Sequence, residues 1–174
     1  KIHNYLVDNY SGKIHISLGM TKPKEIEMII DFYRKHNRLK SLVLYSCTSA
    51  YPVPAEDICL LEIEKLMDLY GNLIDSFGFS GHHNGIAPDI AAYTIGHLQQ
   101  KKTGTKFEYI ERHFTLDRTW KGTDHAASLE PGGLTRLIRD ISNVSKSLDY
   151  KRSDILKIEE PSRNKLKDII SEII

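Results

Sequence analysis

Four times along this chain, an apolar run is followed by a polar turn and then by a segment with helical periodicity. The apolar runs end at Ser17, Thr48, Ser80 and Glu111, so successive ends are 31, 32 and 31 residues apart. A parallel strand, its crossover helix and the connecting turns occupy roughly 30 residues. The repeat therefore predicts an α/β fold with a parallel sheet, either closed as a barrel or open and doubly wound.

The apolar pattern within each repeat predicts the individual elements. SLVLYS, which begins at Ser41, is apolar on both faces, as buried parallel strands are. Ile26, Ile29, Ile30 and Tyr33 recur with the spacing of a helix that packs on one side. We expect strands at residues 13–17, 41–46, 75–79 and 107–110, and helices at 21–37 (with Thr21 as N-cap), 56–70, 88–98 and 131–148, between a polar lead (1–11) and a charged, helix-prone tail.

Composition restricts the class of partner. The 174 residues are 40% hydrophobic and 27% charged, which suits one soluble domain or part of a larger one. A net charge of +1 lacks the concentrated basic face of nucleic-acid-binding domains, so we expect small ligands and no nucleic acid. Two cysteines without a C-x-x-C motif indicate a reducing compartment, and no apolar run is long enough for a membrane span, so we expect a cytoplasmic protein.

Two histidines and a carboxylate lie where the last two strands end. Because the carboxyl ends of parallel strands share one edge of the sheet, His82 and His113 could together ligate a divalent metal. The alternative is a pair of ordinary loop histidines. Glu111 shares a strand face with His113 and could act as a general base or orient a substrate hydroxyl. Its alternative is an ion pair with a lysine across the barrel.

Hydroxyl and carboxylate side chains surround the same edge. The serines and the threonine could hold phosphate or carboxylate oxygens, although each such residue by itself is more often a turn or cap residue. Asp124, in the loop 121–126, could offer its carboxylate to sugar hydroxyls, with a solvated surface position as the alternative. Tyr51 by itself suggests a packed loop aromatic. The hydroxyl residues considered are Ser17, Thr48, Ser49 and Ser80.

Four motifs together resemble the sialic acid synthase family. They are Gly19-Met20, CTSAYPVPAED from Cys47, GFSGHHNGI from Gly78, and ERHFTLDRTWKGTDHAASLEP from Glu111. The resemblance covers about residues 12–148, with a weaker echo at 157–170. It implies a (β/α)8 TIM barrel, of which this chain would hold the last four βα units.

The resemblance also implies roles for individual residues. His82 and His113 match the two ligands of a divalent metal, Mn or Mg, and Glu111 matches a catalytic carboxylate near the reacting carbons. The implied substrate-binding residues are Asp124 for the hydroxyls of the acceptor sugar, Ser17 and Ser80 for phosphoenolpyruvate, and Ser49 and Tyr51 in the substrate-lining loop.

The implied reaction is a metal-dependent condensation of phosphoenolpyruvate with an N-acylmannosamine, its 6-phosphate or a related sugar. C3 of phosphoenolpyruvate attacks the sugar aldehyde, water adds to C2, and phosphate leaves by C–O cleavage to give a nine-carbon sialic-type acid. Ser80-Gly81-His82 and the TWKG run from Thr119 resemble the branch that includes the 9-phosphate synthases, which leaves phosphorylated and free acceptors both open. Leu18 departs from the small or hydroxyl residue usual before Gly19.

The domain interpretation follows from what the chain lacks. Residues 1–150 are expected to be the carboxyl-terminal half of a barrel domain, and 151–174 a helical tail or linker toward an antifreeze-like domain. The lysines that the family places on earlier strands and the arginine of that domain have no counterpart, so we expect no activity from this chain alone. The resemblance also implies a homodimer at full length. Two alternatives remain: a non-catalytic half-barrel that binds a sugar or assembles, and a metal-dependent barrel hydrolase or aldolase.

Overall fold

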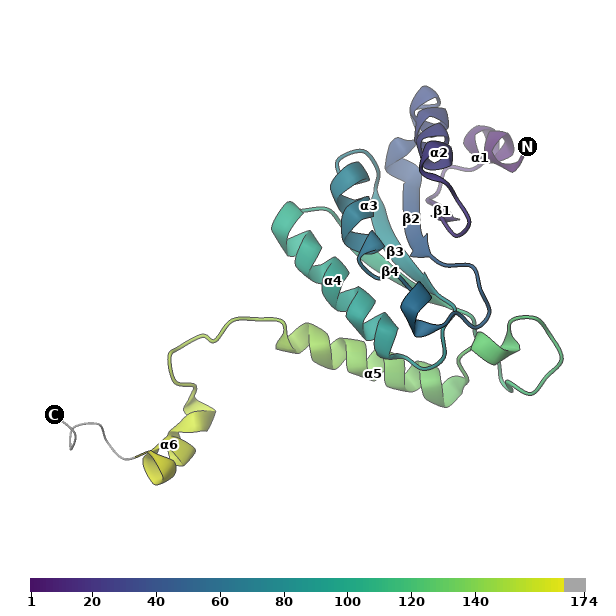
Figure 1. The fold of residues 1–174 in the computed structure, drawn as a ribbon. Helices are drawn as coiled ribbons and strands as arrows, with labels where there is room; N and C mark the ends of the chain where they lie inside the picture. Colours follow the sequence, from purple (N-terminus) through teal and green to yellow (C-terminus); the bar gives the residue numbers. More distant parts are fainter. Residues whose placement is uncertain (168–174) are drawn as a thin grey trace.

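A computed structural model describes residues 1–167, which form a four-stranded parallel sheet with helices packed on one side (Figure 1). The strands lie in sequential order, β1-β2-β3-β4. They are β1 (Ile14–Ser17), β2 (Leu42–Cys47), β3 (Ser76–Gly81) and β4 (Phe107–Arg112), and the helices are α1 (Ile2–Asn9), α2 (Pro23–Lys35), α3 (Glu62–Tyr70), α4 (Ala87–Thr103), α5 (Pro131–Ser147) and α6 (Glu160–Leu166).

One face of the sheet and three helices make the hydrophobic core. Leu42, Leu44, Phe77 and Phe79 alternate along β2 and β3, are almost fully buried, and belong to one cluster with apolar residues of α2, α3 and α4. A doubly wound sheet would place helices on both faces and reverse its strand order. Sequential strands with crossover helices on one face are instead the arrangement of part of a (β/α)8 barrel, as predicted.

The opposite face of the sheet carries polar and aromatic side chains. His15, Tyr45 and Tyr109 lie side by side there, and His15 Nδ1 shares a hydrogen bond with the Tyr45 hydroxyl at 2.8 Å. Burial, with smaller contributions from Tyr109 and Glu111, raises the pKa of Tyr45 to about 12, so this hydroxyl remains protonated. Strand alternation directs Leu42, Leu44, Phe77 and Phe79 to the helices and leaves these polar rings on the open face.

An ionic network joins the amino ends of the strands. Lys13, just before β1, contacts the carboxylate of Asp75 at 2.7 Å and reaches Glu108 and the Tyr109 hydroxyl of β4. Partial burial alone would raise the pKa of Asp75, but hydrogen bonds from Lys13 and Ser76 lower it below its usual value. The network links the outermost strands on the face that has no helices.

Three helices differ from the sequence prediction by more than two residues. The third crossover helix, α4, ends at Thr103 and not at residue 98. The N-cap of α2 is Lys22 and not Thr21. Residues 2–9, predicted to be a polar lead, form α1, and the His3 ring bonds the hydroxyl of the buried Tyr33 at 2.7 Å. The second crossover helix begins at Glu62 and not at residue 56. A short 3-10 turn, Ala55–Asp57, comes first, and the positive φ of Cys59 interrupts the helix between them.

The carboxyl-terminal segment extends from α5 and carries α6, which Figure 1 shows set apart from the sheet. The predicted helical tail, 151–174, contains α6, while its last residues, 168–174, lie outside the described part of the chain. Within residues 1–167, no helix combines the length and apolarity needed to cross a membrane.

Gly96 tests the packing of α4 on the sheet. A Cβ at this position would lie 2.2 Å from Cγ of Phe107. We expect Gly96→Val to lower the unfolding free energy, measured by urea denaturation, by about 1–3 kcal/mol, because overpacking forces the helix or the ring to move. Leu98→Val places the same side chain at an exposed site of α4 and should cost less than about 0.5 kcal/mol. Equal losses would show that the contact with Phe107 is not the cause.

Asp75 predicts an acid dependence of stability. Because its pKa is lower in the folded protein than in the unfolded chain, its contribution is present above the unfolded value, about 3.9, and is lost as pH falls through the folded value. We expect Asp75→Asn to reduce the difference between urea midpoints at about pH 7 and about pH 3. The control is Asp8→Asn, since Asp8 is exposed and forms no ion pair within residues 1–167. An undiminished pH dependence in Asp75→Asn would contradict this role.

Candidate active site

Three potential metal ligands meet where β3 and β4 end. His82 follows β3 directly, Glu111 is the penultimate residue of β4, and His113 follows β4. One ligand atom from each of these residues lies within 4.8 Å of those of the other two. His82 is buried, whereas Glu111 and His113 are half-buried, so the group is accessible from one side. We call these three residues the histidine–glutamate cluster.

Strand register explains how the cluster forms. Ser80 pairs with Glu111 in the parallel ladder between β3 and β4, so these side chains point to the same face. The Ser80 hydroxyl donates a hydrogen bond to Oε2 of Glu111. Glu111 makes no other hydrogen bond or ion pair within residues 1–167, including none with a lysine. Its second oxygen is therefore free to take a cation or a proton.

The hydrogen bonds of His82 determine which ring nitrogen can bind a metal. Its Nδ1 lies 3.0 Å from the backbone oxygen of Thr48, and a carbonyl can only accept, so Nδ1 carries the proton. Nε2 then keeps its lone pair. The Ser80 hydroxyl lies 3.4 Å from Nε2, but its one proton already goes to Glu111. A metal-binding histidine usually donates a hydrogen bond from its other ring nitrogen to a carbonyl or carboxylate, as His82 does to the oxygen of Thr48.

His113 has a carboxylate neighbour. Its Nδ1 lies 3.6 Å from Oδ2 of Asp124, and its ring lies edge-on to that of His82 with 5.1 Å between centroids. Two imidazoles and one carboxylate with open positions suit a divalent transition metal. Magnesium prefers oxygen ligands, so this donor set fits Mn better than Mg.

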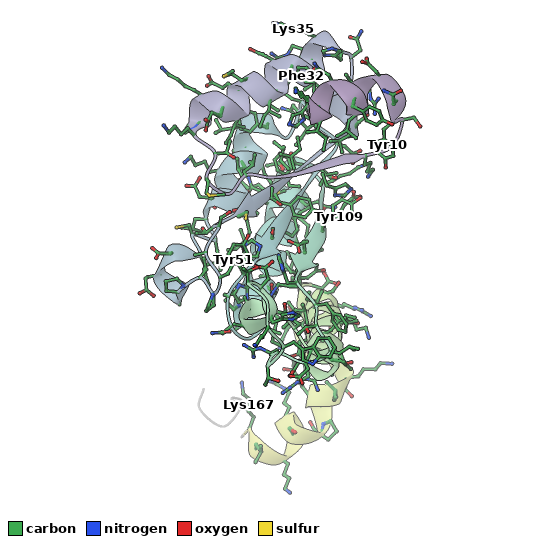
Figure 2. The ribbon with its side chains drawn as sticks, turned by 90° about the vertical axis from the view of Figure 1, so that its right-hand side faces the viewer. Tyr10, Phe32, Lys35, Tyr51, Tyr109 and Lys167 are labelled. Atoms are coloured by element: carbon green, nitrogen blue, oxygen red, sulfur yellow. The ribbon has the colours of Figure 1, made fainter. Side chains whose placement is uncertain are left out.

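The other predicted residues lie at different distances from the cluster. The Tyr51 ring lies beside both histidines and is tilted to them, with ring centroids 4.4 Å from His82 and 5.7 Å from His113. In the side view of Figure 2, Tyr51 lies nearer than Tyr109 to the loops that lead to α5. Ser49 instead abuts Gly19, where a Cβ would lie 2.1 Å from the serine hydroxyl.

Ser17 ends β1, two strands away from β3, and makes no hydrogen bond to the cluster within residues 1–167. The structure thus gathers His82, Glu111, His113, Ser80, Tyr51 and Asp124, and it leaves Ser17 and Ser49 on the neighbouring strand ends. The individual roles stay predictions.

Behind the cluster lies a buried ionic group that sequence reasoning missed. Arg112 donates to the carboxylate of Asp89 and to the backbone oxygens of His83, Gly85 and Ala127. It therefore holds together the two loops that carry His82 and Asp124. His83 completes the group, with Nε2 3.2 Å from Asp89. Removing one partner of a buried ion pair such as Arg112–Asp89 typically lowers the unfolding free energy by about 3–5 kcal/mol.

Only part of this group has a signal in the sequence. Alternation along β4 places Arg112 on the face opposite Glu111 and His113, so an arginine there must enter the helix layer and find an acid. Nothing local marks Asp89 as that acid, since it lies 23 residues away in the first turn of α4. His83 is buried and lies beside Asp89, which indicates a structural role.

Comparison with known proteins places this architecture in a family. A model described as the NeuB family matches residues 5–153. The chain belongs to the NeuB family. Relatives include the N-acetylneuraminate-9-phosphate synthase of Homo sapiens, 34% identical over 159 residues, and the N,N'-diacetyllegionaminic acid synthase of Campylobacter jejuni, 33% identical over 137 residues. These matches cover 91% and 78% of this chain, but only 40% and 37% of the relatives.

A solved NeuB-type structure agrees with the fold. The N-acetylneuraminic acid (sialic acid) synthetase of Leptospira borgpetersenii superposes with a TM-score of 0.65 at 27% sequence identity. The match covers 88% of this chain and 50% of that protein. The family and the barrel-type fold predicted from the sequence motifs are therefore confirmed, while the chain spans about 40% of the length of the curated relatives named above.

The cluster predicts metal binding. We expect the chain to bind Mn²⁺, and we expect His113→Ala to weaken the affinity at least about tenfold, because one of three ligands is lost. Titration calorimetry, or electron paramagnetic resonance of free Mn²⁺, measures this. His36→Ala is the matched control, because His36 is exposed at the end of α2 and bonds only the Phe32 carbonyl. An affinity that His113→Ala leaves unchanged would refute the assignment.

Proposed function

We propose that this chain contributes the carboxyl-terminal part of the active site of a sialic-acid-type synthase. The reaction joins phosphoenolpyruvate to an N-acylmannosamine, its 6-phosphate or a related sugar, and releases phosphate. The observation that carries the proposal is the histidine–glutamate cluster at the strand ends of a NeuB-family fold. Relatives named as N-acetylneuraminate-9-phosphate and N,N'-diacetyllegionaminic acid synthases support the substrate class.

His82 and His113 would hold the divalent cation, with Glu111 as the third ligand or as its neighbour. When bound, the cation supplies Lewis-acid polarisation of the aldehyde in the open-chain sugar. The Thr48 carbonyl orients His82, and Asp124 orients His113, so the imidazoles present their other nitrogens without rearrangement. Because the donor set contains two nitrogens, we propose Mn in preference to Mg.

Glu111 is the proposed proton-handling residue. As C3 of phosphoenolpyruvate bonds to the aldehyde carbon, positive charge develops at C2, and a nearby carboxylate stabilises it. Water then adds to C2, and the same carboxylate accepts a proton from that water. This proton balances the one taken up by the former aldehyde oxygen, and the C–O bond to phosphate then breaks. The hydrogen bond from Ser80 fixes one carboxylate oxygen and leaves the other free for these steps.

The remaining polar residues would bind the two substrates. Asp124 is partly exposed beside His113 and can accept hydrogen bonds from the acceptor's hydroxyls. The Tyr51 ring, packed against both histidines, forms a wall of the acceptor site. Ser17, Ser49 and Ser80 lie at or just after the carboxyl ends of three adjacent strands and are proposed to contact the phosphate and carboxylate of phosphoenolpyruvate.

The four strands are proposed to be half of a closed barrel. β1 and β4 are the edges of the sheet within residues 1–167, and the face with His15, Tyr45 and Tyr109 would be the barrel interior. The polar side chains at the carboxyl ends of the strands support this proposal, because active sites of (β/α)8 barrels lie at that end and take residues from several strands. The other half would supply the remaining phosphate-binding groups, and the complete enzyme would be a homodimer.

The activity test uses this chain joined to the amino-terminal barrel half of the human N-acetylneuraminate-9-phosphate synthase. We expect phosphate release only when phosphoenolpyruvate is present together with N-acetylmannosamine or its 6-phosphate. Glu111→Gln should lower kcat by a factor of about 10² or more, because it removes the acid–base group. Glu108→Gln, at the other end of β4, is the control that should retain activity.

Three outcomes would oppose the proposal in different ways. Phosphate release without a sugar would favour a hydrolase, and full activity of Glu111→Gln would exclude its role. Turnover by residues 1–174 as an isolated monomer would exclude the half-barrel interpretation while leaving the chemistry in place. Circular dichroism of the joined protein first establishes that it is folded.

A further inference from the structure

A cavity lies on the helix side of the sheet, behind the histidine–glutamate cluster. Its volume is about 220 Å³, and it is enclosed by the loops that follow β3 and β4 and by the beginning of α5. It shares no lining residue with the cluster, because Arg112 points to the opposite face of β4 from Glu111 and His113. Its lining residues are His83, Asn84, Gly85, Ile86, Arg112, Arg118, Ala127, Ser128, Leu129, Glu130, Gly133 and Arg136.

The charges of this cavity are unbalanced. Arg112 is paired with Asp89, but Arg118 and Arg136 form no ion pair within residues 1–167. The one acidic lining residue is Glu130, whose Oε1 accepts a hydrogen bond from the backbone of Arg118. Two guanidinium groups around one small cavity repel each other, and a bound anion would remove that repulsion.

Two long helices also begin at this cavity without a capping side chain. Ile86 occupies the N-cap of α4 with a side chain that cannot accept a hydrogen bond, and the side chain of Glu130 at the N-cap of α5 accepts none from the helix. The first turn of α5 contains Gly132 and Gly133 and no acidic residue. The first turn of α4 already contains Asp89, which pairs with Arg112. An anion is therefore the natural partner for the uncapped N–H groups and the positive dipole end of α5.

Buried side chains of the cavity wall retain unused hydrogen-bonding atoms. The side chains of Arg112 and His83 are only 4% and 2% exposed, yet Nε of Arg112 and Nδ1 of His83 have no partner. Leaving a buried polar atom unsatisfied normally costs about 1–3 kcal/mol. These atoms belong to lining residues of the same cavity as the unpaired arginines and the uncapped helices, which indicates a polar ligand.

We propose that this cavity binds a phosphate dianion, either free or as the phosphate group of a phosphomonoester. Arg118 and Arg136 neutralise the two negative charges of the dianion, and the first-turn amides of α5 donate hydrogen bonds to its remaining oxygens. A tetrahedral dianion matches this arrangement better than a carboxylate, because it offers four oxygens to donors that approach from several sides. Loops after the last two strands of (β/α)8 barrels frequently bind phosphate, and β3 and β4 are the last strands of this sheet.

The test titrates inorganic phosphate into the purified chain by calorimetry. We expect Arg118→Gln and Arg136→Gln each to weaken binding about tenfold or more, and the double variant to abolish it, because each loses a charge-assisted hydrogen bond. Arg139→Gln is the matched control, since Arg139 is exposed on α5 and pairs with Asp140. Both substituted arginines are at the surface, and equal urea midpoints confirm that the variants remain folded.

Further measurements identify the source of the phosphate and exclude the histidine–glutamate cluster as its binding site. N-acetylmannosamine 6-phosphate that binds more tightly than inorganic phosphate identifies a phosphomonoester ligand, and weaker binding identifies free phosphate. The loss of phosphate binding in the double arginine variant would itself exclude the cluster, because the cluster contains neither Arg118 nor Arg136. Absence of phosphate binding, unchanged affinity in the double arginine variant, or acetate binding as tight as phosphate would each overturn the proposal.

Discussion

The parallel pairing of β3 with β4, whose register shifts by one residue between Phe77 and Gly78, is the constraint on which both candidate sites depend. It sets Ser80 beside Glu111 and Gly81 beside Arg112. Side chains alternate across a sheet, so Glu111 and His113 face the open side while Arg112 enters the helix layer. A shift of one residue would exchange these faces, placing a carboxylate among apolar helices and removing the arginine from its acid.

Arg112 ties the end of β4 to α4 and to the two neighbouring loops. A buried guanidinium is costly unless its donors are used, and here it bonds Asp89 and three backbone oxygens in two loops. The same loops carry His82 and Asp124 toward the open face. The buried pair therefore positions the candidate metal ligands from behind, and its stability depends on the packing of α4 against the sheet.

The two faces of the sheet differ in composition and in what they contact. The helix-covered face is apolar because it holds α2, α3 and α4, whereas the open face has a network of tyrosine, histidine and lysine side chains that partly shield one another. An open face of this kind can be hydrated or can line a substrate cavity. This explains how four parallel strands can present an active-site edge within a chain that spans about 40% of the length of its curated relatives.

Local patterns in the sequence determined the strand–helix repeat and the residue types at the strand ends. They also determined the four strands to within two residues at each end. The reason is that the strand period of two residues and the helix period of about 3.6 are properties of neighbouring residues. The motifs around Gly78 and Glu111 also determined the family. Tertiary structure alone decided that α1 forms against Tyr33, that α3 begins at Glu62, and that Asp89 pairs with Arg112. Each of these depends on contacts between residues distant in sequence, whose energies no local pattern records. The cavity with Arg118 and Arg136 belongs to the same class, because only the packing of two loops and two helix ends brings those charges together.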